Sequence, residues 1–163
     1  MAYLVRKISR GKWQLNDDVG PVNADAITLC LRTSGNTLSF WRVNREEDVL
    51  EGVLAIAASN DNLDKLDIVV LEEARLVGLN LRIDVTPGKT ACTDLISSHR
   101  DLAGLTVRDL ATVSEEIAAE IRSDNVKRYG LKRLKEIVQK AVDDKRIELE
   151  NLSEGVRKKL SAS

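Results

Sequence analysis

The stretch LDIVVLEEARLVGLNLRIDV, residues 66–85, decides the fold because it is the most apolar part of the chain. Residues 66–71 form a short β-branched run, which predicts a buried strand. Residues 72–77 begin with acidic side chains, which favours a helix start, and Gly78 suits the left-handed residue that ends a helix. Residues 79–85 alternate apolar and polar side chains, which predicts a strand with one face on a core. One long strand that continues through 72–77 is the alternative.

A β-hairpin is the clearest local prediction outside this stretch. Residues 27–33 and 37–43 are strand-like runs on either side of Ser-Gly-Asn at 34–36, and Gly-Asn suits a two-residue hairpin turn. One face of the hairpin is apolar and predicts core. The other face is half-polar and holds Cys30, Trp41 and Val43. This second face is either an exposed interface patch or a surface covered by a helix.

Helical patterns follow the hairpin and dominate the second half of the chain. Asn44 is expected to cap an amphipathic helix that ends near Asn60. We expect residues 97–104 to be irregular, Thr106 to cap a helix at 107–113, and residues 115–129 to be helical up to Gly130. Further helices are expected at residues 131–142, which carry a strong apolar stripe, and at 154–160, capped by Ser153.

The sequence therefore predicts an α+β fold. The hairpin and the two strands of 66–85 form a small mixed sheet that packs against the helix after Asn44, and residues 2–8 are expected to form a further strand. Residues 1–90 form the β-rich region, and 91–163 form a helical region that is either part of the same domain or an extension of it.

Composition and charge narrow the functional classes. The chain has 163 residues, a formal net charge of −1 and two cysteines, so no disulfide framework is expected and a cytoplasmic location is the default. No signal peptide or bilayer-spanning run is evident, so no membrane association is expected. The charge is uneven: residues 1–45 carry +4, residues 46–126 carry −10 and residues 127–163 carry +5. Such asymmetry indicates either a polyanion-binding end or complementary faces.

Catalytic motifs are weak. Gly88-Lys89-Thr90 lacks the earlier glycine of a phosphate-binding loop, because position 83 is isoleucine. His99, the single histidine, is imaginable in a nucleophile pair with Cys92 or a neighbouring serine, but a structural role is the preferred interpretation.

No metal or cofactor is expected. One histidine and two distant cysteines do not make a zinc site. A magnesium site of acids near strand ends is harder to exclude, and it would use Asp67, Glu72 or Glu73, and Asp84, with Lys89 beyond them.

A basic run near the C-terminus is the strongest electrostatic signal. It comprises Lys127, Arg128, Lys132, Arg133, Lys135 and Lys140. These side chains form a solvated helix face, contact phosphates of a nucleic acid, or flank an apolar stripe that docks on a partner. The scarcity of aromatic residues argues against recognition of single strands by base stacking.

Three hypotheses for function follow. The first is a non-catalytic accessory or adaptor subunit of a cytoplasmic assembly, joined to other subunits or to itself. The chain as a whole resembles small accessory proteins of bacterial defence operons, although no single motif carries this resemblance. The second is a nucleic-acid-binding protein that uses the basic C-terminal helices. The third is a metal-dependent hydrolase or nuclease around Asp67, Asp84 or His99.

Overall fold

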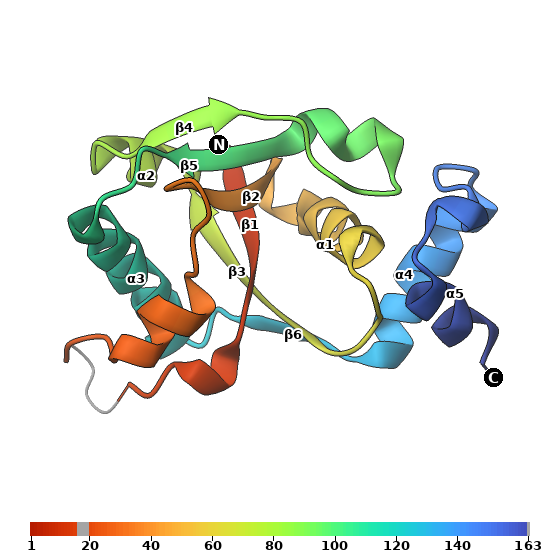
Figure 1. Cartoon of the computed structure of the whole chain (residues 1–163), viewed down its shortest axis with the longest axis horizontal. Helices are drawn as coiled ribbons and strands as arrows, with labels where there is room; N and C mark the ends of the chain where they lie inside the picture. The colour runs from red at the N-terminus through yellow and green to blue at the C-terminus, as the bar shows by residue number, and fades with distance from the viewer. Residues whose placement is uncertain (16–19, 163) are drawn as a thin grey trace.

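The computed structural model describes residues 1–15 and 20–162. The fold is built around a six-stranded antiparallel sheet. The strand order across the sheet is β4-β5-β2-β1-β3-β6 (Figure 1). The strands are β1 (Tyr3–Ile8), β2 (Leu38–Val43), β3 (Leu66–Glu72), β4 (Arg82–Val85), β5 (His99–Ala103) and β6 (Lys127–Tyr129). The α+β prediction is confirmed, although every strand pair is antiparallel and the sheet is not mixed.

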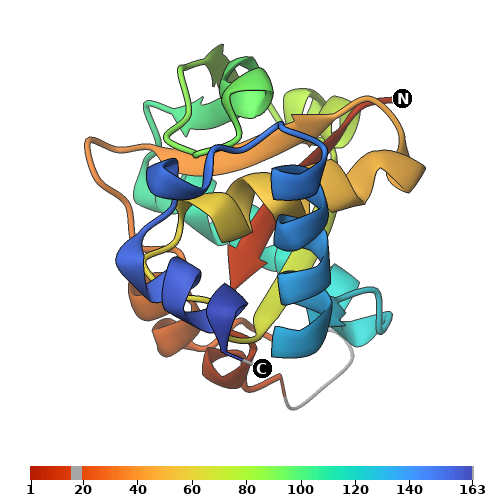
Figure 2. The ribbon, with the colours of Figure 1, turned by 90° about the vertical axis from the view of Figure 1, so that its right-hand side faces the viewer.

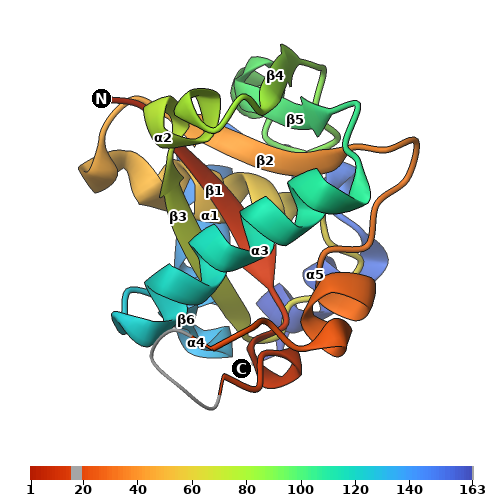
Figure 3. The same ribbon diagram turned by 90° about the vertical axis from the view of Figure 1, so that its left-hand side faces the viewer.

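Helices cover both faces of this sheet. The α-helices are α1 (Val49–Ser59), α2 (Glu73–Gly78), α3 (Val107–Arg122), α4 (Leu131–Asp143) and α5 (Glu154–Ser161). Short helical turns connect them: η1 (Arg10–Lys12), η2 (Ala26–Cys30), η3 (Glu46–Asp48), η4 (Thr93–Ser98) and η5 (Leu149–Asn151). Helices α1, α4 and α5 lie on one face (Figure 2), and α3 crosses the other face (Figure 3). In the described part of the chain, no helix is both long and apolar enough to cross a membrane.

Two hydrophobic cores result, one on each side of the sheet. Side chains on β1 alternate between them, since Val5 packs under α1 and Leu4 packs under α3. The core under α1 also takes Leu134 and Val138 from α4, and Val156 from α5. Residues 1–90 and 91–163 therefore contribute side chains to the same cores.

The predicted hairpin is wrong in its first strand. Gly35 and Asn36 do form the tight turn, with φ of 61° and 58°, but only Ser34 and Thr37 bridge across it. Residues 26–30 instead form the π-helical turn η2. The partners of β2 are β1 and β5, and pairing with β1 places Val5 opposite Trp41. A distant strand has displaced the local one from the edge of β2.

The C-terminal region is helical as predicted, but two short strands within it were not predicted. Residues 99–103, expected to be irregular, form β5 between β4 and β2. Residues 127–129, expected to end a helix, form β6 beside β3. The two helices expected on either side of Ser114 are one continuous helix, α3. The Ser114 hydroxyl donates a hydrogen bond to the Ala111 carbonyl within this helix, so the serine does not interrupt it.

Other local predictions are confirmed. Residues 66–71 lie in β3, and α2 follows at once, so the alternative of one continuous strand is excluded. Thr106 caps α3 in a capping box with Asp109, and the Ser153 hydroxyl caps α5. The expected cap at Asn44 is wrong, because its side chain accepts a hydrogen bond from Arg42 and α1 begins only at Val49.

Candidate functional site

The proposed interface patch is buried. Trp41 is 7% exposed and stands edge-on to the His99 ring, with the ring centroids 5.0 Å apart. Val43 lies with Trp41 in the core under α1, whereas Cys30 lies in the core under α3. Cys30 and Trp41 belong to different cores, because the first strand of the hairpin that would have placed them on one face does not form. The covered-face interpretation is therefore correct.

His99 is held in a structural hydrogen-bond chain. The Thr86 hydroxyl donates to Asp101 at 2.9 Å and lies 2.8 Å from Nδ1 of His99. Because the single hydroxyl proton is used on Asp101, Nδ1 of His99 donates to Thr86. Burial lowers the pKa of His99, which favours the neutral ring at neutral pH. These contacts agree with the structural role expected for this residue.

The surroundings of Cys92 do not activate its thiol as a nucleophile. Its thiol donates to Asp94 at 2.9 Å rather than to His99. Burial and the neighbouring Asp94 raise the pKa of the Cys92 thiol to about 12. Since the thiolate is the reactive form, the pairing of Cys92 with His99 that the sequence suggested is not assembled.

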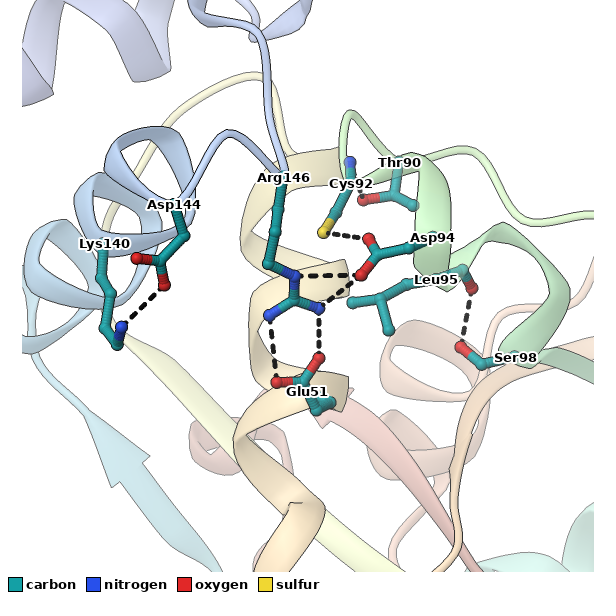
Figure 4. A network of polar contacts seen from close by, with 9 residues as sticks. All are labelled: Glu51, Thr90, Cys92, Asp94, Leu95, Ser98, Lys140, Asp144 and Arg146. Carbon is teal, nitrogen blue, oxygen red and sulfur yellow. Dashed lines mark hydrogen bonds and ion pairs between the residues drawn. The ribbon is translucent and has the colours of Figure 1, made fainter.

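The same cysteine belongs to a polar network that ties three segments together (Figure 4). Arg146, in the turn after α4, binds Glu51 of α1 through two hydrogen bonds, at 2.5 and 3.2 Å. It also donates to Asp94 at 2.9 Å. These contacts raise the pKa of Arg146. The network holds the C-terminal helices against α1, so we assign it a structural role.

The acids proposed for magnesium do not converge. Asp67 is on β3 and Asp84 on β4, and three strands lie between them. Asp67 is 7% exposed and receives two hydrogen bonds from Arg128, while Glu73 pairs with Arg42. Within residues 1–15 and 20–162, no group of three histidine, cysteine or carboxylate side chains is placed to hold a metal ion. The acids of the magnesium alternative are therefore not assembled into one site in the described part of the chain.

The C-terminal basic residues are mostly paired with acids or backbone. Salt bridges join Lys127 to Glu46, Arg128 to Asp67, Arg133 to Glu136, and Lys140 to Asp144. Lys135 donates to the carbonyl of Ala162. Carboxylates thus neutralise much of the predicted phosphate-binding face of α4. Of the six basic residues, only Arg128 also belongs to a second cluster of cations.

That cluster surrounds a hollow of about 510 Å³ at one end of the sheet. We call it the basic pocket, and its cationic members are Lys7, Arg10, Lys12, Lys65 and Arg128. They come from β1, from η1, from the residue before β3, and from β6. Two carboxylates, Asp64 and Asp67, also line it. The fold brings both basic ends of the chain together here, because the end of β1 and β6 lie on either side of the start of β3.

Four of these cations form no salt bridge with any described carboxylate. In the described ranges, no salt bridge involves Lys7, Arg10, Lys12 or Lys65, whereas Arg128 is held by Asp67 with an Nε–Oδ1 distance of 2.6 Å. Arg10 donates to the backbone carbonyl of Trp13, which fixes its side chain without neutralising it. The pocket is therefore a region of positive potential within a protein of nearly zero net charge.

Arg6, the residue before Lys7 on β1, is a cation held by carbonyls rather than by a salt bridge in the described residues. Arg6 donates to the carbonyls of Ser39 and Cys30, and its guanidinium stands 5.5 Å above the Phe40 ring. Burial lowers the pKa of Arg6 to about 10. Arg6 occupies the place where the β1–β2 ladder ends, so its hydrogen bonds replace strand pairing there.

Sequence reasoning found the charge asymmetry but not the pocket. The N-terminal charge of +4 was visible, yet Lys7, Arg10 and Lys12 were not selected as site residues because a basic strand end and a loop have no motif. Lys65 lies in the acidic segment 46–126, away from the basic residues of either end of the chain. Only the pairing of β1 with β3 brings it beside the others.

Comparisons of the chain with models of known protein families, with curated proteins and with solved structures found no match. Its function therefore has to be inferred from the residues themselves.

Proposed function

We propose that this protein binds the phosphate backbone of a nucleic acid through the basic pocket. The observation that carries the proposal is a group of four cations around one hollow that form no salt bridge among the described residues: Lys7, Arg10, Lys12 and Lys65. Nucleic-acid affinity comes mainly from such cations, which release counterions when they neutralise phosphates.

Backbone contacts rather than base reading fit this surface. The ten residues that line the basic pocket include no aromatic side chain, so no platform is present for stacking bases. Contacts to phosphates position a protein but carry no sequence information. We therefore expect binding that depends strongly on salt and weakly on sequence.

An anionic membrane is a poorer match for the same charges. Proteins that bind membrane surfaces combine cations with exposed apolar side chains that enter the lipid. Among the described residues, the large exposed apolar side chains are Met1, Leu29, Leu50, Val77, Leu79, Val85, Val107 and Leu149. None of them lines the basic pocket.

The binding test uses fluorescence anisotropy with labelled single-stranded and duplex oligonucleotides of random sequence at low salt. Lys7→Gln combined with Lys65→Gln should weaken binding, since both side chains are exposed and their removal leaves the cores intact. The matched comparison is Lys132→Gln combined with Arg133→Gln on α4, which removes the same charge. Absence of binding to every oligonucleotide at low salt would overturn the proposal, as would a larger loss in the α4 variant.

A second candidate function is an accessory or adaptor subunit of a protein assembly, including one in bacterial defence. The observation in its favour is the open edge of β4, which is the outermost strand of the sheet and carries Val85 at 71% exposure. A stoichiometric protein that co-purifies with the tagged chain after nuclease treatment would support this function. A chain that purifies alone would count against it.

A further inference from the structure

Strand β4 ends the sheet with one edge unpaired. Within the described residues, β4 pairs with β5 and no strand lies against its outer edge (Figure 1). An exposed edge presents backbone N–H and C=O groups that can pair with another strand. Natural sheets usually protect such edges from unwanted pairing. The side chains of β4 therefore decide which strand can pair with this edge.

Those side chains are divided by face. Arg82 and Asp84 point to one side of the sheet, and Leu81, Ile83 and Val85 point to the other, because successive residues of a strand alternate. Arg82 and Asp84 form a salt bridge at 2.7 Å, and both are exposed enough to change partner. Each β4 therefore offers one cation, one anion and an apolar row of Ile83 and Val85, whereas Leu81, just before the strand, is buried in the core under α3.

We propose that the occupant of this edge is β4 of a second copy of the chain, in antiparallel pairing about a two-fold axis at Ile83. This register places Arg82 opposite Asp84 of the second copy, and Asp84 opposite its Arg82. On the other face it places Ile83 opposite Ile83, and Leu81 opposite Val85. Cross-strand pairs of opposite charge and of apolar side chains are the ones that stabilise a sheet.

Neighbouring registers are unfavourable. A shift of the axis to Arg82 places the two Arg82 side chains opposite each other, and a shift to Asp84 does the same with the two carboxylates; like charges directly opposite are destabilising. A slip by one residue faces the apolar row of one strand with the charged row of the other. Of these registers, the one centred on Ile83 alone is self-complementary.

The existing sheet also favours a cation beside Asp84. On its paired side, Asp84 lies directly opposite Asp101 of β5, which is a like-charge pair. The hydroxyls of Ser39 and Thr86 donate to Asp101, but no hydroxyl does so for Asp84 in the described residues. Arg82 of a second copy would supply positive charge to Asp84 from the open side.

A short strand pair predicts a weak dimer. The contact spans about five residues of each copy, which belongs to the small interfaces of under about 1,200 Å². We therefore expect a dissociation constant for the dimer in roughly the micromolar range or weaker. The inference is independent of nucleic-acid binding and of the recovery of a different protein, so it is tested in an assay of its own.

The test is sedimentation velocity of the full chain from about 1 µM to about 500 µM, without nucleic acid. The wild type should shift from monomer to dimer as concentration rises. Asp84→Arg and Arg82→Asp should each weaken the dimer by at least about tenfold, because each places like charges opposite one another. The combined exchange, Arg82→Asp with Asp84→Arg, should restore it.

The control is Glu115→Arg, an exposed position on α3 with the same change in charge as Asp84→Arg, and it should leave the dimer unchanged. Circular dichroism verifies that each variant folds, and the charge exchange provides a second check because it keeps the net charge of the wild type. A wild type that stays monomeric throughout would overturn the inference. So would a dimer that Asp84→Arg leaves intact, or one that the charge exchange fails to restore.

Discussion

Removal of two lysines from the basic pocket should change the salt dependence of nucleic-acid binding by a predictable amount. Four cations of the pocket form no salt bridge within residues 1–15 and 20–162, so the protein is expected to neutralise about four phosphates. For duplex DNA this number gives a slope of about −3.6 in log affinity against log salt, and a loss of about 150-fold between about 50 and about 200 mM. Lys7→Gln with Lys65→Gln should leave a slope of about −1.8 and a loss of only about 12-fold.

Anisotropy titrations at four or more salt concentrations measure this slope directly. The variant with Lys132→Gln and Arg133→Gln should keep nearly the full slope, because Arg133 is already paired with Glu136. A wild-type slope near zero would refute the electrostatic reasoning. An equal reduction of the slope in both double variants would refute the assignment of the phosphates to the basic pocket.

Three further predictions concern stability. Arg146→Ala should lower the free energy of unfolding by about 1–2 kcal/mol in urea titrations, since it leaves the Glu51 carboxylate without its two hydrogen bonds. Gly52→Ala should also destabilise, by about 1–2 kcal/mol, because a Cβ there would stand 2.8 Å from Cβ of a valine on β1. Stability should fall between about pH 9 and about pH 12, because the folded state raises the pKa of Cys92 and so holds its proton more tightly than the unfolded chain does. Below about pH 9 this contribution is fully present, and Cys92→Ala should make the alkaline fall smaller.

Each of these predictions has a matched control. Lys140→Gln breaks an exposed pair with Asp144 and should cost less than about 0.5 kcal/mol, so an equal cost for Arg146→Ala would contradict the role of the network. Gly11→Ala meets no atom within 4 Å and should be nearly neutral, so an equally neutral Gly52→Ala would contradict the close approach of α1 to β1. For Cys92, identical pH profiles of wild type and variant between pH 9 and 12 would contradict the raised pKa.

Local patterns predicted much of this fold because they act over a few residues. The β-branched run at residues 66–71 became β3, and the caps at Thr106 and Ser153 begin α3 and α5 as expected. The apolar stripe of α4 was also right, since Leu134, Val138 and Ala141 are buried.

Strand pairing between distant residues caused most of the errors. Residues 27–33 have a strand-like composition, but β1 takes the position beside β2, and the turn at Gly35 and Asn36 is left with a single bridge. Charged side chains concealed β5, whose Arg100 and Asp101 break the apolar alternation. Helix propensity extended the predicted helix into residues 127–129, but pairing with β3 makes these residues the strand β6.

The candidate site was the least predictable part for the same reason. The sequence pointed to six cations between Lys127 and Lys140, and most of them are paired with acids that lie one turn away or on another segment. The unpaired cations lie on segments far apart in the chain, so only the sheet brings them together. Charge asymmetry between regions is visible in a sequence, but the pairing of individual charges is a property of the fold.

The most direct test of nucleic-acid binding is an NMR titration of the isotope-labelled protein with a short oligonucleotide at low salt. Our account predicts that the amide shifts concentrate at Lys7, at residues 9–12, at Lys65 and at Arg128, and that high salt reverses them. Shifts confined to α4 would assign binding to the helix that the sequence suggested. An unchanged spectrum at saturating oligonucleotide would contradict nucleic-acid binding altogether.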